Sequence, residues 1–190
     1  MMPTIDVIDK IIESITDEEH QKLFDRWSGE YKKRIYGNRE SPLPKEHSRY
    51  PGFEKNFNAL LFGALNGHDP HCEWPYASWI DGSLEKVDVH SFINKDEVWF
   101  ELGMYTDGDK EKYEKDFAKL LKIVENGSRN IIGILIHFEV FKIGRVFSIF
   151  RELEQAHKNN YLIDSNKFDV NGCLVACRLS IRKRITEPQL

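Results

Sequence analysis

The sequence predicts an α/β fold in which a mixed central sheet is flanked by helices, with a helical extension at the N-terminus. Apolar residues recur at helical spacing through the first third of the chain, and strand-like segments alternate with helical ones in the second half. The 190 residues are 41% hydrophobic and 31% charged, as in an ordinary globular protein. We therefore expect a single domain over residues 1–190, with N-terminal helices and a loop over residues 1–52 and an α/β core over residues 53–185.

Three helices are expected before the first strand. Isoleucines at helical spacing predict a first helix over residues 5–15, with Thr4 as a candidate N-cap. The sequence Thr-Asp-Glu-Glu over residues 16–19 has the form of a capping box and begins a second helix. Prolines and glycines then predict a loop over residues 37–52, and another apolar stripe predicts a helix over residues 53–66.

The second half of the chain has the pattern of strands separated by helices. The run IIGILIHF, residues 131–138, is apolar on both faces, which is typical of a strand that helices cover on two sides. Residues 94–96 are turn-like and join two strands in a hairpin. The expected strands span residues 86–93, 97–105, 131–138 and 173–181, and the expected helices span residues 109–126 and 142–157.

The segment between the third helix and the hairpin shows no clear periodicity. It contains HDPHC, residues 68–72, whose histidines and cysteine are ligand types that zinc favours. Because no second cluster at suitable spacing supplies further ligands, we expect a loop of polar residues here.

Composition and charge narrow the class of protein. A formal net charge of −4 argues against a surface coated with positive charge for indiscriminate nucleic-acid binding, although a local basic cleft remains compatible with it. The odd count of three cysteines is typical of buried thiols in a reducing compartment. The N-terminus lacks a basic region followed by a long apolar one, and no window approaches the length of a membrane span. We expect a cytoplasmic protein without membrane contact.

Ionisable residues gather on one face of the expected hairpin. Lys86, Asp88 and His90 alternate with valines on the first strand. On the second strand, Glu101 shares a face with Gly103, while the other face is apolar. The polar face either holds a functional site or is simply exposed to water. The apolar reverse face, and the position of the hairpin just before a helix and a buried strand, favour a site.

The register of the hairpin decides which of these residues meet. A short turn that pairs Asn94 with Glu97 places Asp88 directly opposite Gly103. Glu101 then lies diagonally from Asp88, at about 7 to 8 Å between backbones. Two carboxylates that lean together across this separation can bind one divalent cation.

These features resemble the PD-(D/E)xK nuclease superfamily, which has the restriction-endonuclease-like fold. The resemblance covers roughly residues 53–181 and rests on the order helix, meander of strands, helix, strand, helix, strand. In that family an Asp on one strand and an Asp/Glu-x-Lys on its neighbour bind Mg²⁺, and the lysine positions or activates the attacking water. The resemblance implies that Asp88 and Glu101 are catalytic residues that hold Mg²⁺ or Mn²⁺.

The sequence departs from the family pattern at two positions. Val87 stands where a proline is usual, and Gly103 stands where the lysine belongs. Without a cation there, the attacking water loses its positioning and part of its electrostatic activation. In the family the lysine is sometimes supplied from another place, and the candidates here are Lys86, Lys115 and Lys119. Glu54, on the third helix, is either an additional metal ligand or a solvated residue of a first helical turn.

A group of basic residues lies at the end of the last expected strand. Such a patch can contact nucleic-acid phosphates, or it can be a charged strand terminus that discourages sheet-edge aggregation. Its members are Arg178, Arg182, Lys183 and Arg184.

The sequence leaves three functional hypotheses. The first is a divalent-metal-dependent nuclease whose partner is nucleic acid. The alternative is a catalytically inactive member of the same fold that acts as a binding or regulatory module, as a subunit of a larger assembly. The third is a small α/β protein whose hairpin carries no site. The resemblance also implies that the chain can form a homodimer, because many members pair to cut two strands.

Overall fold

The computed structural model describes residues 2–16, 53–75, 86–104, 110–127, 130–140, 144–170 and 174–184. The expected second helix and the loop over residues 37–52 lie outside these ranges.

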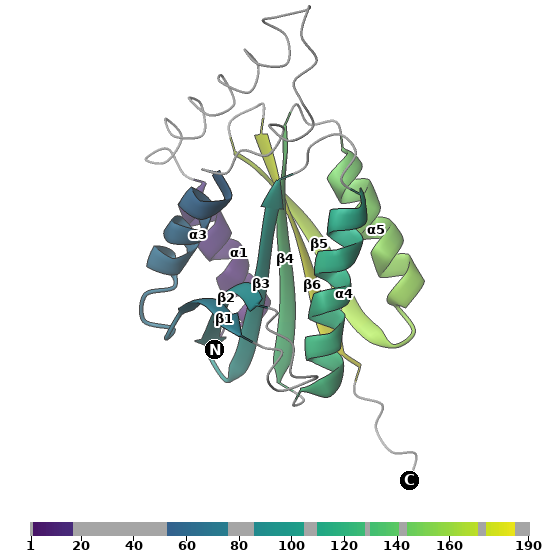
Figure 1. Cartoon of the computed structure of the whole chain (residues 1–190), viewed down its shortest axis with the longest axis horizontal. Coiled ribbons are helices and arrows are strands. Elements are labelled where there is room, and N and C mark those ends of the chain that lie inside the picture. Colours follow the sequence, from purple (N-terminus) through teal and green to yellow (C-terminus); the bar gives the residue numbers. More distant parts are fainter. Residues whose placement is uncertain are drawn as a thin grey trace, which may run out of the picture.

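The described strands form one six-stranded mixed sheet (Figure 1). They are β1 (His71–Pro75), β2 (Lys86–Ile93), β3 (Asp96–Met104), β4 (Ile131–Val140), β5 (Tyr161–Asp169) and β6 (Leu174–Lys183). The strand order is β1-β2-β3-β4-β6-β5. β3 and β4 run parallel, whereas every other neighbouring pair is antiparallel. This arrangement confirms the expected α/β fold with a mixed sheet.

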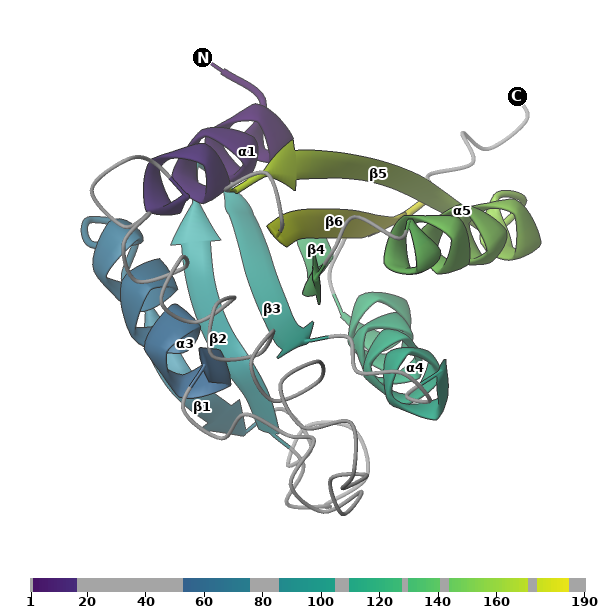
Figure 2. The same cartoon turned by 90° about the horizontal axis from the view of Figure 1, so that it is seen from above.

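Helices cover both faces of the sheet. The described helices are α1 (Thr4–Ile15), α3 (Phe53–Ala64), α4 (Lys110–Asn126) and α5 (Arg145–His157). α1 and α3 lie on one face, and α4 and α5 lie on the other (Figure 2). The N-terminal helix is therefore present as expected. None of the described helices is long and apolar enough to cross a membrane.

The central strand β4 separates two apolar cores. Ile132, Ile134 and Ile136 pack in the core beneath α1 and α3, whereas Ile131 and Leu135 pack in the core beneath α4 and α5. Burying each of these side chains contributes about 1.5 to 3 kcal/mol. The apolar character of both faces of β4 thus follows from its position between two helical layers.

Two edge strands differ from the expectation. β1 begins at His71, so the prediction of a loop over residues 68–72 is wrong from that residue onward. β5 lies in a segment for which no strand is expected, and of its side chains only Tyr161 and Phe168 are buried. An edge strand has one neighbour and exposes half of its side chains, so its sequence lacks the apolar run that marks β4.

The β2–β3 hairpin forms as expected, but its turn differs from the prediction. Ile93 pairs with Asp96, which leaves Asn94 and Lys95 as the two loop residues. Asn94 has a φ of 57°, a left-handed conformation that asparagine tolerates better than most residues. A short loop with asparagine in this conformation is common in hairpins.

This turn shifts the register by two residues. A shift of two keeps each side chain on its face but changes its neighbours. The pairing ends at Val89 opposite Phe100, so Asp88 and Glu101 are the next residues along the two strands. The prediction that Asp88 faces Gly103 is therefore wrong, and Asp88 lies closer to Glu101 than the predicted register implies.

Candidate active site

Asp88 lies where β2 departs from strict alternation. Val87 packs in the core beneath α4 and α5, whereas Val89 packs in the core beneath α1 and α3. A regular strand would place both valines on one face. Asp88 Oδ2 accepts a hydrogen bond from the backbone N–H of Leu102 at 2.7 Å. This charge-assisted bond anchors the carboxylate to β3, next to Glu101.

Glu101 lies on β3 beneath helix α4 and forms an ion pair with Lys119 of that helix. The distance from Lys119 Nζ to Glu101 Oε1 is 2.7 Å, and the Glu101 side chain is only 5% exposed. The same ammonium donates a hydrogen bond to the backbone carbonyl of Lys86 at 3.3 Å. Lys119 thus bridges α4 to β2 and β3 at the position of the two carboxylates.

Burial and charge perturb both members of this pair. Burial, together with the charge of Asp88, raises the pKa of Glu101 to about 8, although Lys119 opposes the shift. For Lys119, burial alone would lower the pKa, but the charge and hydrogen bond of Glu101 and the charges of Asp116 and Asp88 raise it above its ordinary value. Burial is thus the main reason that Glu101 holds its proton more tightly than an ordinary glutamate, and the nearby Asp88 adds to the effect.

Asp116 and His137 extend this cluster deeper into the protein. Asp116 Oδ1 lies 4.0 Å from Lys119 Nζ, and Asp116 Oδ2 lies 3.6 Å from Nε2 of His137 on β4. Both residues are buried. Sequence reasoning missed them, although each is a polar residue in an apolar pattern. His137 interrupts IIGILIHF, and Asp116 lies on the apolar stripe of its helix, between Tyr113 and Leu120.

The glycine at position 103 is explained by this histidine. Gly103 pairs with His137 across the parallel strands β3 and β4. A Cβ at position 103 would lie 2.7 Å from Cε1 and 2.8 Å from Nε2 of the imidazole, closer than real Cβ contacts come. The imidazole therefore fills the space into which a side chain at position 103 would project.

The donor set fits a hard divalent cation such as Mg²⁺ or Mn²⁺. These ions prefer carboxylate oxygens, and Mg²⁺ is commonly bound by one or two carboxylates together with water and substrate phosphates. Asp88 and Glu101 supply two such groups. Within the described residues no group of three or more His, Cys, Asp or Glu side chains could hold a metal ion. A cation would bind in competition with Lys119 for Glu101.

The other candidate residues lie at varying distances from this cluster. Lys86 contributes its backbone carbonyl, which accepts the bond from Lys119. Lys115 is exposed on α4. Glu54 belongs to α3, on the opposite face of the sheet, and its side chain lies outside the described part of the structure. Of the candidate lysines, Lys119 is the one whose ammonium contacts Glu101.

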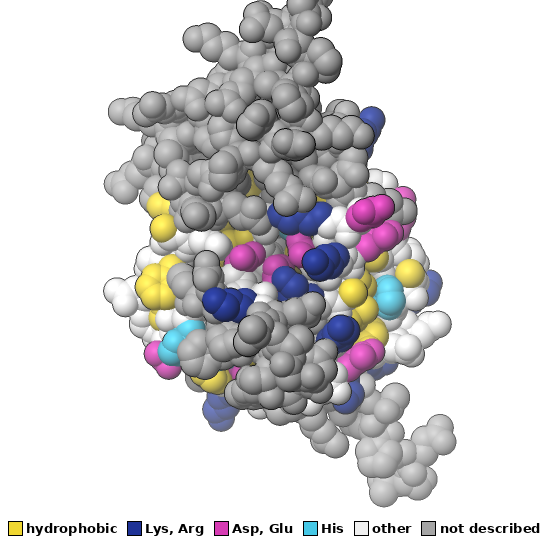
Figure 3. Space-filling view, viewed as in Figure 1, with side chains coloured by type: hydrophobic (Ala, Val, Ile, Leu, Met, Phe, Trp, Pro, Cys, Tyr) yellow, Lys and Arg dark blue, Asp and Glu magenta, His cyan; other side chains and the backbone are white. Residues whose placement is uncertain are grey.

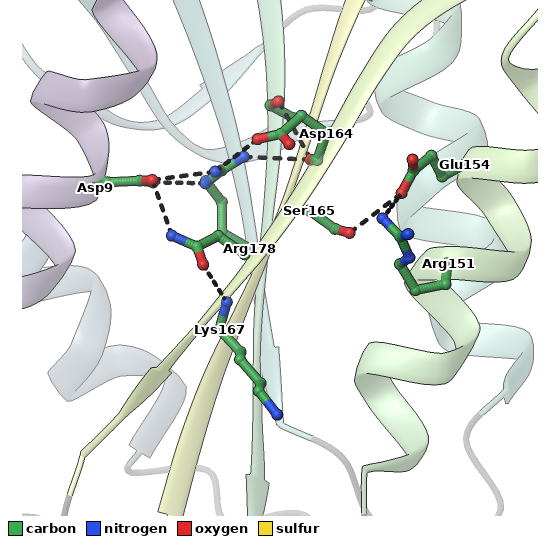
Figure 4. A network of polar contacts seen from close by, with 9 residues as sticks. Asp9, Arg151, Glu154, Asp164, Ser165, Lys167 and Arg178 are labelled. Carbon is green, nitrogen blue, oxygen red and sulfur yellow. Dashed lines mark hydrogen bonds and ion pairs between the residues drawn. The ribbon is translucent and has the colours of Figure 1, made fainter.

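The expected basic patch does not form one surface. Arg178 is 1% exposed, and its guanidinium is held by Asp9 of α1 and Asp164 of β5 (Figure 4). Its Nε lies 2.6 Å from Asp9 Oδ1, and its Nη2 lies 2.9 Å from Asp164 Oδ2. Arg178 therefore ties the N-terminal helix to the far edge of the sheet and presents no free cation to a phosphate.

The three other residues of that patch face different neighbours. Arg182 Nη2 lies 3.6 Å from Asp96 at the hairpin turn. Lys183 donates to the carbonyl of Glu125, and Arg184 donates to the carbonyl of Lys158. Lys183 and Arg184 are exposed. Alternation along β6 sends Lys183 to the opposite sheet face from Arg182, so the run of basic letters does not make a single patch.

The surface view shows charges of both signs close together. On the face drawn in Figure 3, acidic side chains gather near the middle, and Lys and Arg side chains lie around them.

Comparison of the chain with protein-family models, with curated proteins and with solved structures found no significant match.

Proposed function

We propose that the protein is a divalent-metal-dependent nucleic-acid phosphodiesterase of the restriction-endonuclease-like superfamily. The observation that carries the proposal is the meeting of Asp88, Glu101 and the Lys119 ammonium between two neighbouring strands and a helix. The element order supports it as well. α3, the β1–β2–β3 meander, α4 and β4 follow each other as in the family that the sequence resembles.

Asp88 and Glu101 are the residues that would hold Mg²⁺ or Mn²⁺. When bound, such a cation supplies a Lewis acid for the phosphate and lowers the pKa of a bound water. The Leu102 N–H fixes Asp88 in place before any ligand arrives. Because the pKa of Glu101 is about 8, this residue must release its proton to act as a ligand near neutral pH.

Lys119 takes the role that the family gives to the lysine of its motif. Its ammonium approaches the acid pair from α4 rather than from β3, and it lies against Glu101 at 2.7 Å. A cation in this position orients an attacking water and stabilises the negative charge that develops on the phosphate. On this proposal, glycine is tolerated at position 103 because α4 supplies the cation through Lys119.

The charge distribution on one face of the protein supports an anionic substrate. On the face drawn in Figure 3, Lys and Arg side chains lie around acidic ones near the middle. Such cations attract a phosphate backbone even though the chain as a whole has a net charge of −4.

We place the proposed reaction in the cytoplasm, because the odd count of cysteines is typical of thiols in a reducing compartment. Cys177 is a free cysteine and is buried. Burial, with the charge of Glu139, raises the pKa of its thiol to about 12, so it stays protonated and unreactive.

The proposal is tested by cleavage of plasmid DNA, single-stranded DNA and RNA in Mg²⁺ or Mn²⁺. Wild type should cut at least one of these substrates, and chelation of the metal should stop the reaction. Asp88→Asn, Glu101→Gln and Lys119→Met should each lose at least about 100-fold in rate, because each removes a charged group from the reacting centre. Lys115→Met, which removes an exposed lysine of the same helix, should leave the rate unchanged.

Two results would decide against the proposal. Equal cleavage by wild type and Glu101→Gln would indicate a contaminating nuclease. Metal-dependent binding of DNA without cleavage, under all conditions, would instead support the catalytically inactive binding module.

A further inference from the structure

His137 is a buried polar residue in a strand that is otherwise apolar beneath α4 and α5. Its side chain is 0% exposed, and it packs against the rings of Tyr113, at 4.4 Å, and Phe150, at 6.1 Å between ring centroids. A leucine or phenylalanine would fill this volume without the cost of burying a polar ring. A buried imidazole at this position is therefore expected to interact with a polar or charged group.

The imidazole and Gly103 form a matched pair. The ring lies where a side chain at position 103 would begin, with Cε1 2.7 Å from an added Cβ. The glycine makes room for the histidine, and the histidine prevents a lysine from projecting from position 103. The His137 ring thus accounts for the glycine at position 103, where the family motif has a lysine.

The imidazole is connected to the candidate site through one residue, Asp116. His137 Nε2 faces Asp116 Oδ2 at 3.6 Å, Asp116 Oδ1 lies 4.0 Å from Lys119 Nζ, and Lys119 Nζ lies 2.7 Å from Glu101 Oε1. Asp116 Oδ2 is buried, and its 3.6 Å approach to His137 Nε2 is an electrostatic contact slightly longer than a hydrogen bond. A buried carboxylate of this kind depends on nearby partial or full positive charge for its orientation.

We propose that His137 is a positioning residue of the site, which faces Asp116 and holds that carboxylate where it supports the Lys119 ammonium at Glu101. The catalytic part of this inference rests on the proposed function. With no exposed surface, His137 does not touch the substrate. It helps to position the Lys119 ammonium, which takes the place of a lysine that β3 lacks at position 103.

The test compares His137→Leu and His137→Gln with wild type in DNA cleavage. Leucine fills the volume without any hydrogen-bonding group, whereas glutamine carries an amide N–H near the place of Nε2. We expect His137→Leu to lower kcat by about 10- to 100-fold with little change in KM, as for residues that orient a ligand from behind. His137→Gln should recover most of that loss. Equal rates in both variants would overturn the proposal.

A second variant tests whether His137 acts through Asp116. Asp116→Asn should lower kcat to a similar extent, and the double variant His137→Leu with Asp116→Asn should be no slower than the slower single variant. Losses that multiply in the double variant would show independent roles and would overturn the proposed connection.

A readout without cleavage keeps this inference separate from the proposed function. Trace acetylation with acetic anhydride, followed by mass spectrometry, measures the reactivity of Lys119 against that of exposed Lys115. Reactivity of Lys119 should be low in wild type and in His137→Gln, and it should rise toward that of Lys115 in His137→Leu. If wild type cuts no substrate, the proposed function fails, and this measurement still decides the role of His137.

Thermal unfolding shows whether each variant is folded before it is assayed. If His137→Leu does not fold, Asp116→Asn breaks the same connection from its other end. Lys119 reactivity that remains at the wild-type level in a folded Asp116→Asn would equally overturn the proposal.

Discussion

Lys119 on α4 holds its ammonium 2.7 Å from the Glu101 carboxylate on β3, and this ion pair joins the helix to the acidic end of the hairpin. Asp88 and Asp116 also act on the pair through their charges. Burial and these two carboxylates raise the pKa of Glu101, whereas Lys119 lowers it.

Removing the Lys119 charge should raise the pKa of Glu101 further. Lys119 is the group that opposes the upward shift, both through its charge and through its hydrogen bond. In Lys119→Met, Glu101 should therefore titrate above the wild-type pKa of about 8. Carbon-13 NMR of the glutamate carboxyl groups measures this shift. Lys115→Met serves as the control, and an unchanged titration of Glu101 in Lys119→Met would contradict the charge balance described here.

Binding of Mg²⁺ should release a proton from Glu101. The raised pKa means that Glu101 holds a proton to higher pH than an ordinary glutamate, whereas a metal ligand must be ionised. The apparent affinity should therefore increase as pH rises toward the pKa of Glu101 and level off above it. Calorimetry in two buffers with different ionisation enthalpies counts the released protons. Glu101→Gln should bind weakly and release none, and metal binding by wild type without proton release would contradict the assignment.

The sequence predicts the layers and the acid pair because both depend on local patterns. The hairpin pattern keeps Asp88 and Glu101 close to one another both in the predicted register and in the observed one, which differ by two residues. The register itself depends on the turn, and Asn94 in a left-handed conformation selects a tighter turn than the one expected. The neighbours of Asp88 therefore could not be read from alternation alone.

Residues that reach the site from elsewhere in the chain were harder to predict. His137 meets Gly103 because β3 and β4 lie side by side in parallel, and Lys119 meets Glu101 because α4 crosses back over β3. Spacing along the sequence does not encode such contacts. Arg178 shows the opposite error, because a buried arginine and a surface arginine look alike until the partner Asp9 is placed by the packing of α1.

Substitution of Gly103 by alanine should destabilise the protein. The added Cβ would overlap the His137 ring, and overpacking of a buried site costs about 1 to 3 kcal/mol. Gly63→Ala is the matched control, because Gly63 lies in α3 with nothing within 4 Å of an added Cβ. That change should stabilise by about 0.4 to 1 kcal/mol. Urea denaturation measures both free energies of unfolding.

The clash at position 103 can be assigned to His137 by a double variant. Gly103→Ala combined with His137→Ala should lose less stability than the sum of the two single losses, by about 1 kcal/mol or more. Strict additivity of the two losses would place the cost of Gly103→Ala elsewhere.

Asp9→Ala should destabilise the protein much more than the loss of a surface ion pair. Arg178 has a side chain only 2% exposed, and Asp9 contacts its Nε at 2.6 Å (Figure 4). Asp9 also accepts a hydrogen bond from Asn166. Removing one partner of a buried pair costs about 3 to 5 kcal/mol. The lower end of that range is expected, because Asp164 still contacts Arg178 and is itself well exposed.

Arg151→Ala is the control, since Arg151 pairs with Glu154 on the surface of α5 with a side chain 54% exposed, and its loss should cost at most about 1 kcal/mol. Urea denaturation that finds equal costs for the two substitutions would show that α1 is not held to β6 by this arginine. Replacement of both partners, as Asp9→Leu with Arg178→Met, should regain much of the stability, because it removes the buried charge together with its counter-ion.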